Sequence, residues 1–116
     1  MGRLTTHVLD TALGRPAASV EVSLYRQQGD FVFVKTDRTN DDGRLDTPIL
    51  QDDEFQTGVY QLVFKAGDYF RNSQSELPVP AFVDEVVLRF GIADADAHYH
   101  VPLLVSPWSY STYRGS

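Results

Sequence analysis

The sequence contains no cysteine, which excludes disulfide bonds and thiol chemistry and leaves only histidine and carboxylate side chains as metal ligands. Cations are also scarce: 10 lysines and arginines stand against 16 aspartates and glutamates, for a net charge of −6. Proteins that bind nucleic-acid phosphates are normally basic, so we expect no nucleic-acid partner. No apolar run reaches the length of a membrane span, and the first seven residues lack the apolar segment of a signal peptide. These absences predict a soluble cytoplasmic protein without a membrane partner.

The chain does contain enough apolar residues for one core, since 42% of its 116 residues are hydrophobic and 22% are charged. Apolar and polar residues alternate along most of its length, as is typical of half-buried strands. We expect strands at 4–10, 19–26, 31–38, 58–66, 85–91, 98–105 and 109–115, a further short one at 45–47, and a short helix at 67–74. The spacing of the turns predicts an all-β fold, a two-sheet β-sandwich of seven to eight strands with one short helix, in a single domain over residues 1–116.

The strand predicted at 98–105 has two faces of different character. Its inward face carries Tyr99, Val101, Leu103 and Val105, and its outward face carries His98, His100, Pro102 and Leu104. An outer face that combines imidazoles with apolar side chains indicates an interface. Proline has no N–H to donate, so we expect this strand to lie at a sheet edge or to be irregular at its proline.

Three interpretations of the histidines are open at this point. His98 and His100 share one strand face, and together with His7 and a water molecule they would give a three-histidine metal site. A metal-free site is the second interpretation, with one histidine activating water and a second histidine or an arginine stabilising developing charge. In the third, each histidine is a structural residue, and Arg44 and Arg114 are surface charges.

Three stretches together carry a resemblance to a known family. They are Leu-Thr-Thr-His-Val-Leu-Asp at 4–10, Gly-Arg-Leu at 43–45, and Tyr-His-Val-Pro-Leu-Leu at 99–104 followed by Ser-Pro and a closing Tyr-Arg-Gly-Ser. In combination they closely resemble the 5-hydroxyisourate hydrolases of the transthyretin-like family, over essentially the whole chain. The resemblance implies a transthyretin-like sandwich and a homotetramer, a dimer of dimers around a central channel that the outward face of 98–105 would line. It also implies opening of the six-membered ring of 5-hydroxyisourate to give 2-oxo-4-hydroxy-4-carboxy-5-ureidoimidazoline in urate breakdown, with no cofactor and no metal.

The family's motifs also imply the site residues. The catalytic positions of the motif fall on His7, Arg44, His100 and Ser116, and the substrate-binding positions on His7, Arg44, Tyr113, Arg114 and Gly115. We interpret His100 as the base or water-orienting group, His7 as its partner in proton transfer, and Arg44 as the group that binds the heterocycle or stabilises an oxyanion. We interpret His98 as a residue of the pocket rim or a hydrogen-bond partner, not as a catalyst. The rival functions are a transthyretin-like protein that binds small aromatic ligands without catalysis and a structural module for protein–protein contact.

Overall fold

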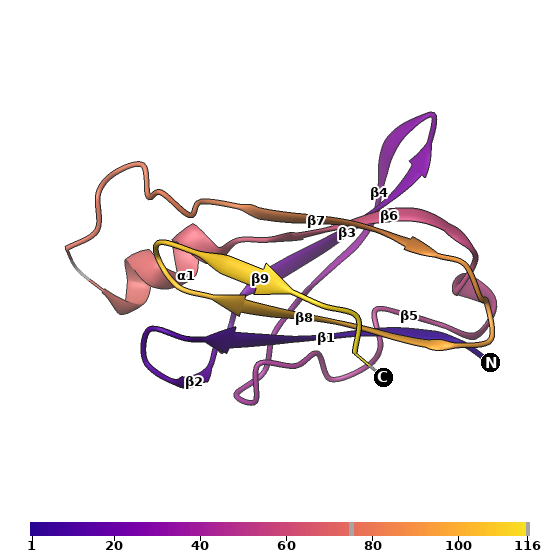
Figure 1. Ribbon diagram of the computed structural model, residues 1–116, viewed down its shortest axis with the longest axis horizontal. Helices are drawn as coiled ribbons and strands as arrows, with labels where there is room; N and C mark the ends of the chain where they lie inside the picture. The colour runs from indigo at the N-terminus through magenta and orange to yellow at the C-terminus, as the bar shows by residue number, and fades with distance from the viewer. Residues whose placement is uncertain (75, 116) are drawn as a thin grey trace.

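The computed structural model describes residues 1–74 and 76–115, and it shows the expected two-sheet sandwich (Figure 1). The described residues form nine strands, one 3-10 helix and one α-helix: β1 Arg3–Asp10, β2 Arg15–Pro16, β3 Glu21–Gln28, β4 Asp30–Arg38, β5 Leu50–Gln51, η1 Asp52–Glu54, β6 Gly58–Phe64, α1 Ala66–Ser73, β7 Val86–Ile92, β8 His98–Val105 and β9 Tyr110–Thr112. Two of these strands, β2 and β5, are only two residues long. The short strand expected at 45–47 is absent, because the chain bends there and pairs with β1 slightly later, as β5.

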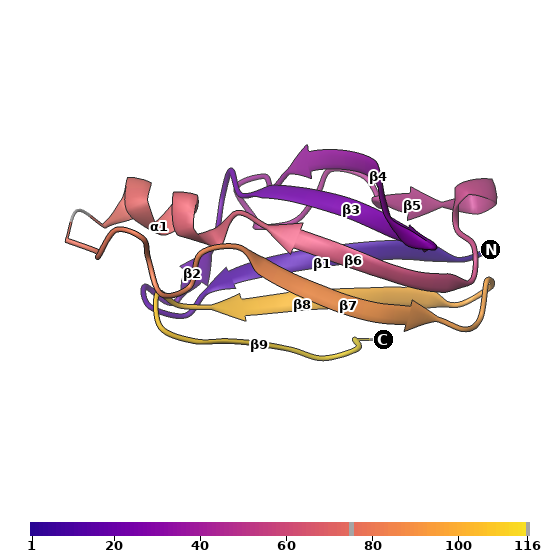
Figure 2. The same cartoon turned by 90° about the horizontal axis from the view of Figure 1, so that it is seen from above.

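The two sheets form two layers, as Figure 2 shows. One sheet has the order β2-β1-β8-β9, with β5 paired to β1 as its fifth strand, and the other has the order β4-β3-β6-β7. All pairs are antiparallel except β1 and β8, which run parallel for eight residues with Thr5 opposite His100 and His7 opposite Pro102. This parallel pair joins the start of the chain to its end.

The inner faces of both sheets supply the core. In β8 the residues Tyr99, Val101, Leu103 and Val105 are buried, as the alternation predicts. Opposite them, Leu24, Leu62 and Phe64 of the other sheet are fully buried, and full burial of one such side chain contributes roughly 1.5–3 kcal/mol. The outer face of the five-stranded sheet, which carries both histidines of β8, therefore stays available for a site.

Strand β8 is an internal strand, so the prediction of an edge strand is wrong, but the predicted irregularity at Pro102 is present. The β8–β9 pairing begins only at Leu103, opposite Thr112. At Pro102 the main-chain oxygen accepts a hydrogen bond from the Thr112 side-chain hydroxyl, at 2.7 Å. The missing proline N–H thus falls where the ladder between β8 and β9 has ended.

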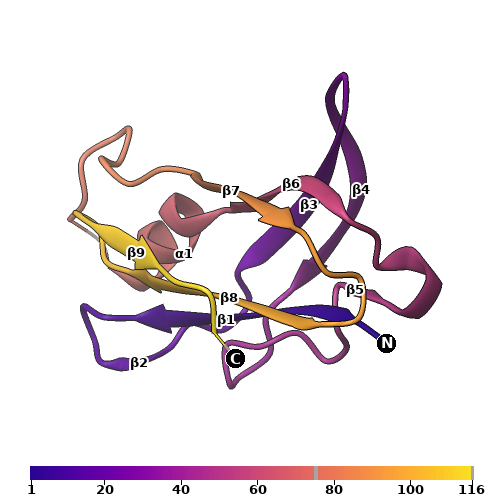
Figure 3. The same cartoon turned by 45° about the vertical axis from the view of Figure 1, so that its right-hand side comes forward.

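The end of the chain returns along β8 toward β1 (Figure 3). Gly115 N–H donates to the His100 oxygen at 2.7 Å and forms an isolated antiparallel bridge there. Within the part of the chain that the structure describes, no helix has the length and apolar character needed to cross a membrane.

Candidate active site

Two histidines of β8 meet a threonine of β1 on the outer face of the five-stranded sheet. Thr5 Oγ1 lies 2.7 Å from His98 Nε2 and 2.8 Å from His100 Nδ1. The two imidazole centroids are 6.2 Å apart. The arrangement follows from the parallel register, which places Thr5 beside His100, and from the two-residue repeat of a strand, which places His98 on the same face.

These side chains line a depression of about 460 Å³. Its lining consists of Arg3, Thr5, Thr6, Arg44, Leu45, Thr47, Pro48, His98 and His100. Hydroxyl, imidazole and guanidinium groups therefore face one small volume, together with the apolar Leu45 and Pro48. A polar heterocycle could be held there by hydrogen bonds and charge at several points of its ring.

A tight turn brings Arg44 to β1. The Asn40 side-chain oxygen accepts hydrogen bonds from the main-chain N–H groups of Asp42 and Arg44, at 2.9 and 3.2 Å. Gly43 completes the turn with a φ of 76°, in the left-handed region that glycine adopts without strain. Its oxygen accepts from Val8 N–H at 2.8 Å, and Arg44 forms an isolated antiparallel bridge with His7. The Asn-Asp-Asp-Gly turn signal in the sequence thus positions the arginine next to the histidine.

The tautomer of His7 follows from its hydrogen bond. His7 Nε2 lies 2.8 Å from the main-chain oxygen of Asp42. A carbonyl oxygen can only accept, so Nε2 carries the hydrogen, and the neutral ring keeps its lone pair on Nδ1. His7 is next to Arg44 but does not line the depression itself.

The environment lowers the pKa of all three histidines below the ordinary value of about 6.5. For His100 the causes are burial, then the positive charge of Arg44, and then the charges that His98 and His7 carry when protonated. For His7 they are burial and then Arg44, while the hydrogen bond to the Asp42 oxygen opposes them. For His98 they are burial and then Arg3 and Arg114. The three rings are therefore predominantly neutral at pH 7 and able to accept a proton.

The predicted C-terminal site residues are divided between two faces. Gly115 packs against the His100 ring, because a Cβ built on Gly115 would lie 2.8 Å from His100 Cδ2. Arg114 instead stacks its guanidinium on the Tyr99 ring, 4.1 Å from the centroid, and Tyr113 is 61% exposed. Both of these side chains line a separate groove of about 400 Å³ between β7 and the chain end. Ser116 lies outside the described residues.

The structure thus brings His7, Arg44, His100 and Gly115 close together. Tyr113 and Arg114 line the other groove, although the Arg114 guanidinium also donates to the His98 main-chain oxygen at 3.4 Å. Sequence reasoning did not single out Thr5, although it lies on the same strand face as His7. The alternation in 4–10 assigns Thr5 to that face, but nothing local identifies β8 as the neighbouring strand.

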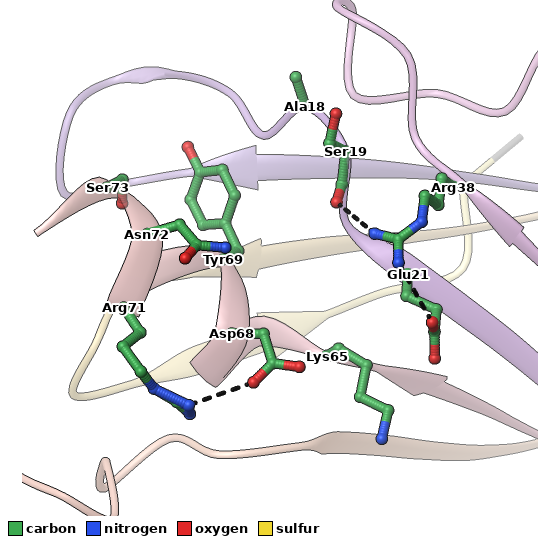
Figure 4. Close-up of a pocket in the computed structure, with 10 residues that line it drawn as sticks. All are labelled: Ala18, Ser19, Glu21, Arg38, Lys65, Asp68, Tyr69, Arg71, Asn72 and Ser73. Atoms are coloured by element: carbon green, nitrogen blue, oxygen red, sulfur yellow. Dashed lines mark hydrogen bonds and ion pairs between the residues drawn. The ribbon is translucent and has the colours of Figure 1, made fainter.

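A second depression of about 400 Å³ lies beside α1 (Figure 4). Its cations are ion-paired, Arg38 with Glu21 at 3.4 Å, Arg71 with Asp68 at 3.2 Å and Lys65 with Glu85 at 2.6 Å. It has no histidine among its lining residues. With neither a base near neutral pH nor an unpaired cation on its walls, it is a poorer candidate for catalysis.

Metal ligation was the other chemical interpretation of the histidines. In residues 1–74 and 76–115, no group of three or more His, Cys, Asp or Glu side chains is arranged to hold a metal ion. One nitrogen of each histidine lies within hydrogen-bond distance of a protein oxygen, Thr5 Oγ1 for His98 and His100 and the Asp42 carbonyl for His7, so the other nitrogen of each ring is the one available for chemistry.

Comparison with known proteins is consistent with this arrangement. Residues 4–115 match the model of the HIUase/Transthyretin family, where HIUase denotes 5-hydroxyisourate hydrolase. The chain is 63% identical to 5-hydroxyisourate hydrolase 2 of Rhizobium meliloti, an alignment that covers 99% of this chain and 97% of that protein. It is 62% identical to the 5-hydroxyisourate hydrolase of Pseudomonas aeruginosa, over 100% of this chain and 93% of that one.

A solved structure shows the same likeness in three dimensions. The 5-hydroxyisourate hydrolase of Klebsiella pneumoniae superposes with a TM-score of 0.83 at 32% identity, and the match covers 100% of both chains. The fold, the cluster of His7, Arg44 and His100, and the full-length similarity agree with one another. This chain belongs to the HIUase/Transthyretin family.

Proposed function

We propose that the protein hydrolyses 5-hydroxyisourate, opening its cyclic amide to give 2-oxo-4-hydroxy-4-carboxy-5-ureidoimidazoline in the breakdown of urate. The observation that carries the proposal is the neutral His100 imidazole, held by Thr5 and accompanied by Arg44, in a depression large enough for a small heterocycle. Relatives more than 60% identical over the whole chain bear the name of this hydrolase.

The mechanism needs a base, an oxyanion stabiliser and an acid. His100 Nε2 takes a proton from a water molecule as the water oxygen bonds to the amide carbon. The Arg44 guanidinium stabilises the negative charge that develops on the amide oxygen, and its planar fork suits a flat, electron-rich ring. The carbon–nitrogen bond then breaks, and protonated His100 returns its proton to the departing nitrogen. All atoms of the water end up in the product, and the enzyme is regenerated.

His7 has a supporting role in this scheme. Its Nε2–H is engaged by the Asp42 oxygen, so Nδ1 is the nitrogen that can exchange a proton with substrate or solvent. We keep Gly115 as a binding residue through its contact with His100. Ser116, Tyr113 and Arg114 remain proposed site residues, the first outside the described residues and the other two on the groove beside β7.

Local charge favours this substrate class despite the overall net charge of −6. Arg3 and Arg44 both line the depression, and none of the described side chains that line it is a carboxylate. Positive groups in a depression concentrate field there and attract an electron-rich ligand.

A homotetramer, a dimer of dimers, is part of the proposal. The depression lies on the outer face of the five-stranded sheet, where a single chain leaves it open. Large apolar side chains are also exposed at the opposite end of that sheet, beyond Val105, among them Trp108, which stacks on Phe82, and Tyr110. Packing of copies over the outer face of this sheet would enclose the site. We also propose the cytoplasm as the location, which cell fractionation would test.

An absorbance assay tests the activity. Urate oxidase generates 5-hydroxyisourate from urate, and the protein is expected to accelerate its decay well beyond the spontaneous rate. His100→Ala and Arg44→Ala should each lower kcat/KM by about 10²–10⁴. Arg71→Ala, which removes an ion-paired arginine from α1, is the matched control and should keep wild-type activity. Retained activity after chelator treatment is expected for the metal-free mechanism, and loss would contradict it.

Other outcomes decide between the remaining functions. Saturable binding of an aromatic ligand together with decay no faster than the blank would favour the ligand-binding module and refute the hydrolase. Neither binding nor turnover would favour a structural role. Light scattering on the same samples measures the mass in solution, and a monomer would refute the tetramer while leaving the hydrolase proposal to the assay.

A further inference from the structure

The Thr5 hydroxyl is a single bridge between two imidazoles, and it has only one hydrogen. Its oxygen lies 2.7 Å from His98 Nε2 and 2.8 Å from His100 Nδ1, both within hydrogen-bond distance. A hydroxyl donates one hydrogen bond and can accept others. When both rings are neutral, the hydroxyl uses its own hydrogen in the bridge only if it donates to one ring and accepts from the other.

This restriction couples the tautomers of the two rings. If Thr5 donates to His98 Nε2, then His100 Nδ1 carries the hydrogen that Thr5 accepts, and both rings are Nδ1–H tautomers. If Thr5 donates to His100 Nδ1, then His98 Nε2 carries the hydrogen, and both rings are Nε2–H tautomers. Of these two arrangements, only the first leaves the lone pair of His100 on Nε2.

The nitrogen that matters for chemistry is this Nε2. It has no hydrogen-bond partner within residues 1–74 and 76–115, whereas Nδ1 is taken by Thr5. Gly115 packs against Cδ2 of the same ring and so limits its rotation. A ring held at Nδ1 and packed at Cδ2 presents Nε2 in a fixed direction.

We propose that Thr5 and His98 are positioning residues that hold His100 as the Nδ1–H tautomer, so that its Nε2 is the unprotonated base. This inference rests on the proposed hydrolase for its catalytic consequence, but the tautomer itself is a property of the free protein. Thr5 and His98 act through His100 in the way that an orienting group holds a catalytic histidine in the correct tautomer. During turnover Nε2 gains a proton from water and returns it to the departing nitrogen, while Nδ1–H stays bonded to Thr5.

The arrangement also links the ionisation of His98 to the tautomer of His100. A protonated His98 donates from Nε2, so Thr5 can no longer donate to His98, and the only ring of the pair to which its hydroxyl can still donate is His100 at Nδ1, in the inactive Nε2–H tautomer. The charged and titratable groups facing the pair are Arg3 and Arg114 at His98 and Arg44 and His7 at His100. All four groups, when charged, lower the pKa of the ring that they face and so disfavour its protonation.

Two substitutions of Thr5 separate the effect of its hydroxyl on kcat from the effect of its side-chain shape. Thr5→Val keeps the branched side chain and removes the bridge, and it is expected to lower kcat by about 10- to 100-fold with KM changed less than about threefold. Thr5→Ser restores the hydroxyl and should recover most of the rate. Thr11→Val is the matched control, since the Thr11 hydroxyl bonds to the Val105 oxygen of the same strand pair, away from both rings. It is expected to retain wild-type kcat.

A double substitution tests whether the pair acts as one unit. His98→Phe frees the Thr5 hydroxyl to donate to His100 Nδ1 and should also lower kcat. If His98 acts through Thr5, then Thr5→Val combined with His98→Phe loses no more than the worse single variant. Additive losses would overturn the coupling.

Nitrogen-15 NMR of the imidazoles gives a readout that needs no turnover. In the wild-type protein at neutral pH, both His98 and His100 are expected as Nδ1–H tautomers, and in Thr5→Val His100 should no longer be held as the Nδ1–H tautomer. Both rings as Nε2–H, different tautomers in the wild type, or identical spectra for Thr5→Val would each overturn the proposal. An inactive wild-type protein with coupled Nδ1–H tautomers would refute the hydrolase function but not the positioning.

Discussion

Gly115 lies directly against the imidazole of His100. Its N–H donates to the His100 oxygen at 2.7 Å, and a Cβ placed on it would approach Cδ2 to 2.8 Å and His100 Cβ to 3.1 Å. The contact explains physically why the smallest residue stands at this position. It also gives the C-terminal segment a direct effect on the geometry of the candidate base.

Gly115→Ala should therefore displace the His100 ring. We expect kcat to fall by about tenfold or more, because a shift of a few tenths of an ångström misaligns a base whose proton transfer depends on distance. Gly91→Ala is the control, since a Cβ at Gly91 meets nothing within 4 Å and should leave the rate unchanged. Equal rates for both variants would show that the ring has room to move.

The turn that carries Arg44 should be equally sensitive at Gly43. This glycine combines a φ of 76° with a Cβ position only 2.4 Å from the Val8 oxygen, so Gly43→Ala is both strained and obstructed. We expect a loss of roughly 2 kcal/mol or more in the free energy of unfolding, measured in urea, together with lower activity.

Gly14→Ala, in a different turn, separates the conformational strain at Gly43 from its steric contact with Val8. Gly14 has a similar φ of 67° but nothing within 4 Å of its Cβ position. Its alanine variant should lose only the conformational part, about 1 kcal/mol, and keep full activity. If Gly43→Ala lowers the free energy of unfolding no more than Gly14→Ala does, the backbone near Val8 moves away from the added methyl group at little cost.

The pH profile should report the charge of Arg44. Burial first, and Arg44 second, lower the pKa of His7, and the same order holds for His100. As the lone pair is needed for base catalysis, kcat/KM is expected to be flat near pH 7 and to fall on the acid side below about pH 6.5. Arg44→Gln removes a positive charge, so both pKa values rise and the acid limb moves to higher pH.

Arg44→Lys distinguishes charge from geometry. It keeps the positive charge, so the acid limb should stay where it is in the wild type, but the loss of the planar fork should lower the rate. An acid limb that moves equally in both variants would contradict the electrostatic account of these histidines.

Asp10 should be important for stability rather than for catalysis. Its carboxylate is 1% exposed and accepts hydrogen bonds from Ala12 N–H, Leu13 N–H and the Tyr69 hydroxyl at 2.9, 3.0 and 2.8 Å. It thereby links the end of β1 to α1. Asp10→Ala leaves these donors without their acceptor and is expected to cost about 2–3 kcal/mol in urea unfolding. The exposed Asp30→Ala should change stability by less than about 0.5 kcal/mol.

Much of this molecule could be predicted from the sequence, because local patterns carry the information. Alternation is a property of neighbouring residues, so it assigned Tyr99 and Val101 to the core and His98 and His100 to the outer face. The Asn-Asp-Asp-Gly turn was likewise predicted from neighbouring residues alone. Pro102 shows the limit of such arguments, since the missing N–H indicated an irregularity but did not tell an edge strand from an internal strand whose ladder stops early.

The sequence by itself determined the long strands, their faces and the family resemblance. Only the tertiary structure decided which strands meet: the parallel pairing of β1 with β8, across more than ninety residues, places Thr5 between His98 and His100. It also decided that Gly115 contacts His100 while Tyr113 and Arg114 line another groove. The physical reason is that strand pairing depends on packing of the whole sandwich, so no local pattern specifies the partner of a strand or the register of the pair.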